Sequence, residues 1–318
     1  MVKEMGVLFA IAAAICNSSI GIFSNILYRS NMVSINIAFY RCAIALVITS
    51  ILCLSNKKLR QDLFKISLKT VSQYAVLSFL GIFIMYYFEI SSMKYIIVPL
   101  VSFLLYSSGI LTIVLSCIFL KEQFNLKKLI SIVLVFMGVA LLFLSNVKAE
   151  SNVMGLVLAS VAGLAYALFL FFMKMFKIES GLKTLFYLFL FGTIYLAIPF
   201  IFTQPDVPAA KNIFPLIALA VIPTICGFYF TVKALNKTDA GKVQLFEMTE
   251  PLFATILSFI ILGQVITKID LLSAIFIFVG LLFLENDTII EIIKDKLSLI
   301  RNYSNRKSYK RKDICNDN

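Results

Sequence analysis

Apolar runs of about 20 residues, each long enough to cross the hydrocarbon core of a bilayer as an α-helix, follow one another along almost the whole chain. Of its 318 residues, 60% are hydrophobic and 14% are charged, whereas a soluble domain is about 45–50% apolar. The sequence therefore predicts an all-α integral membrane protein. We place ten spans, at residues 5–27, 34–54, 71–91, 96–119, 127–145, 153–173, 183–203, 212–235, 240–262 and 269–285.

The second half of the chain repeats the first at a distance of 142 residues. Leu257-Ser258 falls on Leu115-Ser116, and no gap is needed between Gly81 and Leu144. Apolar residues match by chance, so the ungapped register carries more weight than any single identity. Each copy holds five spans, an odd number, so the second must insert upside down. We expect two inverted five-helix repeats, 1–147 and 148–285, and a basic tail at 286–318.

Basic residues between the spans alternate in number. Connections with three or more Lys or Arg alternate with connections that hold one, namely Arg29, Lys94, Lys148, Lys211 and Lys268. By the positive-inside rule, this pattern places both termini in the cytoplasm. We expect a multi-pass protein of the cytoplasmic (inner) membrane. The formal net charge of +12 then reflects orientation in the lipid bilayer, and no nucleic-acid partner is expected.

The tail after Leu284 begins with an amphipathic pattern. Ile289, Ile293 and Leu297 share one face of a predicted helix, which is typical of a helix lying on the membrane surface. The basic remainder is predicted to be disordered. It serves either orientation alone or the binding of a partner.

Two pairs of matched Gly/Pro interruptions point to the site, as in transporters built from repeats. Ser108-Gly109 in span four matches Glu250-Pro251 in span nine, and Gly81 in span three matches Pro223 in span eight. We therefore expect helix breaks at Gly81, Gly109, Pro223 and Pro251, with these four spans lining a central cavity. The alternative is that Gly and Pro are simply common in membrane helices.

Glycines also mark spans five and ten. These spans carry Gly138 and Gly280 and are otherwise apolar. We expect them to be peripheral, with the two glycines allowing close contact between helices.

Glu250 is the leading functional candidate, because a charge near the membrane centre costs about 2.5–3.5 kcal/mol on the insertion scale. It lies about 12 Å deeper than Lys242, close to the midplane, and Glu247 shares its face of the helix. Pro251 leaves the Glu247 carbonyl without its helical donor. We expect Glu250 either to take up a coupling proton or to pair with a substrate amine. The alternative is a structural hydrogen bond between helices.

Other polar residues within the spans complete the expected substrate site. They are Asn17, Tyr40, Arg41, Tyr86, Tyr87, Tyr106, Ser108, Tyr166 and Tyr229. With no Trp in the chain, some of the tyrosines must instead form the aromatic belt at the interfaces. Arg41 either snorkels outward or pairs with a carboxylate in the cavity.

No catalytic constellation is present. The chain lacks His, its six cysteines are scattered without metal-ligand spacing, and no phosphate-binding loop or EF-hand occurs. We expect neither an enzyme nor a bound metal or cofactor.

Over residues 5–285 the sequence resembles the drug/metabolite transporter superfamily, EamA type. The resemblance is carried by Phe39-Tyr40-Arg41, by the run from Leu115 to Glu122, by Ala234-Leu235, by Glu250 to Ala254 and by Leu262-Gly263-Gln264. Gln264 replaces the Glu usual there. Ser108-Gly109 replaces an aromatic residue or Glu followed by Pro, and Cys16-Asn17 and Tyr166 stand where the family often has Trp. These departures fall where ligands would bind, so no member's substrate can be carried over.

The resemblance implies a secondary-active transporter working by alternating access. We expect a small polar substrate, with an amino acid or amino-acid-like compound leading because Arg41 and Glu250 can address the two charges of a zwitterion; the family favours export. A coupling proton or a counter-substrate would drive it. One alternative is uptake or exchange of a cationic or nucleoside-like metabolite such as S-adenosylmethionine. Another is a membrane protein that transports nothing.

The topology can be tested by labelling single cysteines, Lys148→Cys and Lys183→Cys, in a background without native cysteines. An impermeant thiol reagent added outside should label position 148 and not 183, because the basic residues place them on opposite sides. Labelling of both positions, or the reverse pattern, would contradict the inverted repeat.

Overall fold

The computed structural model describes residues 2–96, 98–146, 152–203, 207–263 and 265–285, and the regular elements in these ranges are all helical. Position 148 and the predicted tail lie outside them. The first half holds α1 (Val2–Asn17), α2 (Ile20–Arg29), α3 (Ser34–Ser55), α4 (Lys57–Phe64), α5 (Leu68–Ser78), the π-helical segment η1 (Phe79–Ile84), α6 (Met85–Ser92), α7 (Val98–Ser107), α8 (Gly109–Phe119) and α9 (Leu126–Asn146).

The second half repeats this order. It holds α10 (Val153–Met175), α11 (Leu182–Phe202), α12 (Ala210–Leu219), the π-helical segment η2 (Ala220–Gly227), α13 (Phe228–Lys237), α14 (Ala240–Glu247), α15 (Glu250–Leu262) and α16 (Lys268–Glu285).

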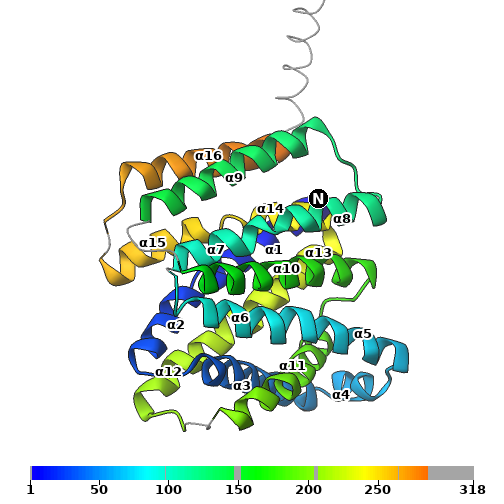
Figure 1. Cartoon of the computed structure of the whole chain (residues 1–318). Helices are drawn as coiled ribbons and strands as arrows, with labels where there is room; N and C mark the ends of the chain where they lie inside the picture. The colour runs from blue at the N-terminus through cyan, green and yellow to red at the C-terminus, as the bar shows by residue number, and fades with distance from the viewer. Residues whose placement is uncertain (1, 97, 147–151, 204–206, 264, 286–318) are drawn as a thin grey trace, which may run out of the picture.

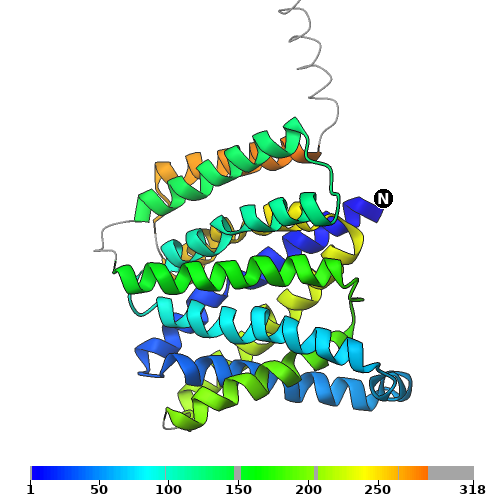
Figure 2. The ribbon, with the colours of Figure 1, turned by 45° about the vertical axis from the view of Figure 1, so that its right-hand side comes forward.

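These elements form the ten predicted spans. Eight stretches of the described residues are long and apolar enough to cross a membrane. The other two spans are α9 and α16, which pack against each other along one edge of the bundle (Figures 1 and 2). α3 and α11 lie at the opposite edge, with α1, α10, α13 and α14 between. The predicted fold class, an all-α membrane protein of two inverted five-helix repeats, is confirmed. The short helix α4 was not predicted.

The interruptions recur at the predicted distance. The two π-helical segments contain Gly81 and Pro223, and the breaks between α7 and α8 and between α14 and α15 precede Gly109 and Pro251. A further break at Ser18-Ser19 separates α1 from α2 and has no counterpart in α10, which runs unbroken.

The contacts between the halves follow a two-fold relation, in which a helix of one half and its equivalent in the other half pack on equivalent partners. α1 packs on α13 and α14, while α10 packs on α6, α7 and α8. α3 pairs with α11, and α9 pairs with α16. Each half therefore completes the other, and the core lies between them.

The halves approach closely at glycines. A Cβ added to Gly138 would lie 2.7 Å from Ile277 Cγ1 and 2.8 Å from the Ser273 carbonyl oxygen, and one added to Gly280 would lie 2.8 Å from Val135 Cγ2. These positions hold α9 against α16, so the predicted close contact is present.

Gly138→Val should therefore lower the free energy of unfolding by about 1–3 kcal/mol, because backbone must move to admit the side chain. Thermal unfolding of the purified protein in detergent measures it. Gly181→Ala is the matched control, since a Cβ there meets no heavy atom within 4 Å. Equal melting temperatures for the two variants would contradict the packing argument.

Candidate functional site

Side-chain hydroxyls satisfy the backbone where the helices break. Ser108 donates to the Leu105 carbonyl at 2.6 Å, and Thr249 donates to the Phe246 carbonyl at 2.7 Å. Irregular backbone at membrane depth is tolerated only where protein or a wet cavity satisfies its polar groups. The two breaks are thus built to persist beside a cavity.

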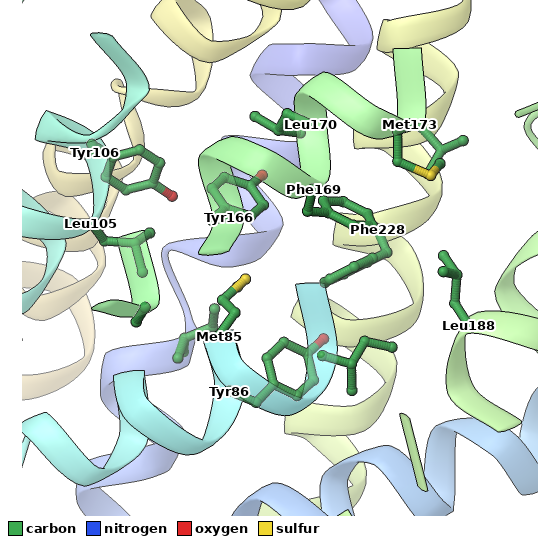
Figure 3. Close-up of a cluster of buried hydrophobic side chains, with 14 of the residues drawn as sticks. Met85, Tyr86, Leu105, Tyr106, Tyr166, Phe169, Leu170, Met173, Leu188 and Phe228 are labelled. Atoms are coloured by element: carbon green, nitrogen blue, oxygen red, sulfur yellow. The ribbon is translucent and has the colours of Figure 1, made fainter. Parts of the chain in front are cut away.

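That cavity is narrow: about 370 Å³ is free of protein atoms when space open to the surroundings is counted, and the part that a water molecule can enter holds about one water. It is lined by Asn17, Ile20, Arg41, Met85, Glu89, Leu105, Tyr106, Tyr166, Phe169, Phe228, Thr231 and Glu250. Figure 3 shows the side chains of Met85, Tyr106, Tyr166, Phe169 and Phe228 gathered around it from four helices. Both halves contribute charged and apolar groups.

Arg41 reaches the cavity from α3. Its side chain is 1% exposed, which rules out snorkelling toward the membrane surface. The guanidinium lies 3.7 Å from the centroid of the Tyr86 ring, and Nε donates to Thr224 Oγ1 at 2.5 Å. No salt bridge joins it to a carboxylate among the described residues, and its Nη1 has no hydrogen-bond partner. Among the described residues, Arg41 therefore neither snorkels nor pairs with a protein carboxylate, and its predicted role in binding a substrate carboxylate stays a prediction.

Glu250 opens α15 and accepts a hydrogen bond from the Tyr106 hydroxyl on α7. This contact joins the two halves across the cavity. Glu250 is 7% exposed, and its position at the first turn of α15 places the carboxylate at the positive end of the helix dipole.

Glu247 lies beside the cavity and not in its lining. Its Oε2 accepts from the Tyr166 hydroxyl and its Oε1 from Thr231, both at 2.6 Å. Both oxygens are therefore engaged within the second half, and the carboxylate fixes α10, α13 and α14 relative to one another.

Glu89 on α6 is a cavity residue that was not predicted. It is 5% exposed, and its Oε2 has no hydrogen-bond partner. The cost of a carboxylate in a membrane span, which selected Glu250, applies equally to Glu89 and would have found it. Thr231 was also missed. It falls on Glu89 at the repeat distance of 142 residues. Once Glu89 was selected, the repeat would therefore have indicated Thr231 as well.

Six predicted site residues fall outside the cavity lining: Tyr40, Tyr86, Tyr87, Ser108, Tyr229 and Glu247. Tyr86 and Glu247 support residues near the cavity, and Ser108 closes a helix break. The other three tyrosines pack elsewhere: Tyr40 on Phe200, Tyr87 on Phe83, and Tyr229 on Phe230. The predicted residues that do line it are Asn17, Arg41, Tyr106, Tyr166 and Glu250.

The model of the EamA-like transporter family matches residues 4–144 and 153–285. The chain belongs to this family. Two similar proteins are each named an uncharacterized transporter. One, from Archaeoglobus fulgidus, is 26% identical over 248 residues, which cover 76% of this chain and 82% of that protein. The other, from Clostridium kluyveri, is 24% identical over 183 residues, which cover 55% of this chain and 59% of that protein.

The fold is similar to that of a solved structure titled only as the crystal structure of a protein. The TM-score is 0.74 at 13% identity, over 88% of this chain and 96% of that one. This similarity supports the fold alone. Family membership makes the protein a multi-pass membrane protein of a transporter family.

The motif that closes span four in this EamA-like protein links the two halves. Glu122 accepts hydrogen bonds from the backbone N–H groups of Ala240 at 2.8 Å and Gly241 at 3.3 Å, at the start of α14. Lys128 Nζ lies 3.2 Å from Glu122 Oε2. The side chains of both residues are 5% exposed, so this is a buried clasp between the end of α8, the start of α9 and α14.

Proposed function

We propose that the protein is a secondary-active transporter that moves a small polar metabolite across the cytoplasmic membrane by alternating access, with both termini in the cytoplasm. An amino acid or amino-acid-like compound is the leading substrate. The observation that carries this proposal is one narrow cavity lined by both Arg41 and Glu250. Arg41 would bind the carboxylate and Glu250 the ammonium group. Export is favoured by family resemblance.

The wall of the cavity suits a compact polar ligand. Its lining combines charged groups with apolar side chains, which include Met85, Phe169 and Phe228. Small-molecule sites usually have such a composition. The aromatic wall also supports the second candidate, a cationic or nucleoside-like metabolite such as S-adenosylmethionine, because rings can stack on a base or hold a cation.

Alternating access would require the links between the halves to exchange. The clasp of Glu122 on Ala240 and Gly241 joins them at one end of α14. Opening the cavity toward that end would break these hydrogen bonds. Buried charge-assisted contacts of this kind stabilise the closed state, so opening requires other interactions to replace them.

The first test is a thermal-shift screen of the purified protein against amino acids and other metabolites, combined with Arg41→Lys. A ligand that binds the native state raises the melting temperature by mass action. Arg41→Lys should lose at least about tenfold in affinity for carboxylate-bearing ligands, because a point charge replaces neither the planar fork nor its stacking on Tyr86. Arg29→Lys, at an exposed arginine, is the control. Unchanged affinity in Arg41→Lys would remove Arg41 from the site.

The second test separates the two roles of Glu250. If it carries the coupling proton, Glu250→Gln should abolish pH-driven accumulation in vesicles and leave substrate exchange intact. If it pairs with an amine, the same change should abolish binding and exchange together. The proposal would be wrong about this carboxylate if Glu250→Gln and Glu250→Ala both transport at the wild-type rate with unchanged pH dependence and Glu247→Gln does not.

A further inference from the structure

The charges around the cavity do not balance. Its lining contains one basic side chain, Arg41, and two acids, Glu89 and Glu250. A zwitterion that neutralised Arg41 and Glu250 would leave Glu89 without a countercharge. An ionised carboxylate buried without a partner costs several kcal/mol unless it takes up a proton, so a positive group on the ligand is one of two ways to neutralise Glu89.

Glu89 also lacks hydrogen-bond donors. Its Oε2 is buried without a partner, as is the hydroxyl of Tyr86 three residues before it, and two other hydroxyls donate to backbone carbonyls. The Tyr28 hydroxyl donates to the Ile90 carbonyl, and the Ser92 hydroxyl donates to the backbone carbonyl of Glu89 at 2.7 Å. By contrast, Glu250 accepts from Tyr106, and Glu247 accepts two hydroxyls. Of these three carboxylates, Glu89 is the one with a buried oxygen still without a donor.

The repeat shows how this unpaired oxygen arises. Glu89 and Thr231 are equivalent at the distance of 142 residues, and both line the cavity. The Thr231 hydroxyl is consumed by Glu247 on the neighbouring α14. The residue equivalent to Glu247 in the first half is Leu105, which offers Glu89 no polar side chain. The first half therefore presents its polar group to the ligand instead of to a neighbour.

We propose that Glu89 binds a second cationic group on the substrate, so that the site takes amino-acid-like compounds with an amine or guanidinium on the side chain. This deepens the proposed function and rests on it: Arg41 takes the carboxylate, Glu250 the α-ammonium and Glu89 the side-chain cation. An N–H donor satisfies the unpaired oxygen as well as the charge, whereas a sulfonium supplies charge alone. Nitrogen cations are therefore favoured over sulfonium compounds.

The test compares ligands of matched size by titration calorimetry on the purified full-length protein: lysine against norleucine, and arginine against citrulline. The wild type should prefer the charged member of each pair by about tenfold or more, as for a charge-assisted hydrogen bond. Glu89→Gln should lose most of this preference and keep its affinity for the neutral member. Glu179→Gln, which removes an exposed acid outside the cavity, is the control and should keep the preference.

Glu89→Asp keeps the charge and should retain part of the preference, which guards against a Gln variant that fails to fold. The wild-type ratios test the proposal even then. Equal affinity for the charged and neutral members overturns it. So does loss of pH-driven accumulation in Glu89→Gln with an unchanged ratio, because Glu89 would then carry the proton. If no amino acid binds the wild type, or if one binds and Arg41→Lys does not change its affinity, the proposed function itself fails. This inference then fails with it.

Discussion

The close approach of the two halves is the constraint on which the rest of the structure depends. Apolar helices gain little by leaving lipid for one another, so membrane helices associate through packing and hydrogen bonds, and small residues allow both. At ten glycines a Cβ would press on a residue of the opposite half: Gly6, Gly81, Gly109, Gly138, Gly155, Gly163, Gly192, Gly227, Gly241 and Gly280. The helix breaks fall along this same interface, which is why the cavity lies between the halves.

The repeat supplies the geometry of the cavity, and divergence between the copies supplies its chemistry. The breaks lie at Ser108 in one half and at Met248-Thr249 in the other, one residue apart in the register of the repeat. The acids are placed asymmetrically, because Glu250 corresponds to Ser108 and Glu89 to Thr231. Each half thus brings one carboxylate to the cavity from a position where the other half has a hydroxyl. This arrangement avoids placing two like charges at symmetry-related points facing each other.

The sequence was sufficient to predict the ten spans, the repeat and the four breaks at Gly or Pro, because hydropathy and Gly/Pro placement are local signals; the helix α4 and the break at Ser18-Ser19 carry no such signal. The sequence could not predict which face of each helix points toward the cavity. A π-helical segment inserts an extra residue per turn and rotates the residues after it by about 100°, so after η1 it is Tyr86, and not Tyr87, that meets Arg41. The partner of Arg41, Thr224, is 183 residues away and is unmarked by any motif.

The hydrogen bonds around the cavity connect ligand binding to the contact between halves. Arg41 of the first half is held by Thr224 of the second, and Glu250 of the second by Tyr106 of the first. On the proposed function, a substrate would take the same two charged groups and so compete with both links. Because an ion pair with the ligand joins two charged groups, whereas each of these links joins one charged group to a neutral hydroxyl, binding would offset the loss of these links when the halves move apart. The groups that recognise the substrate would then also be those that hold the empty cavity closed.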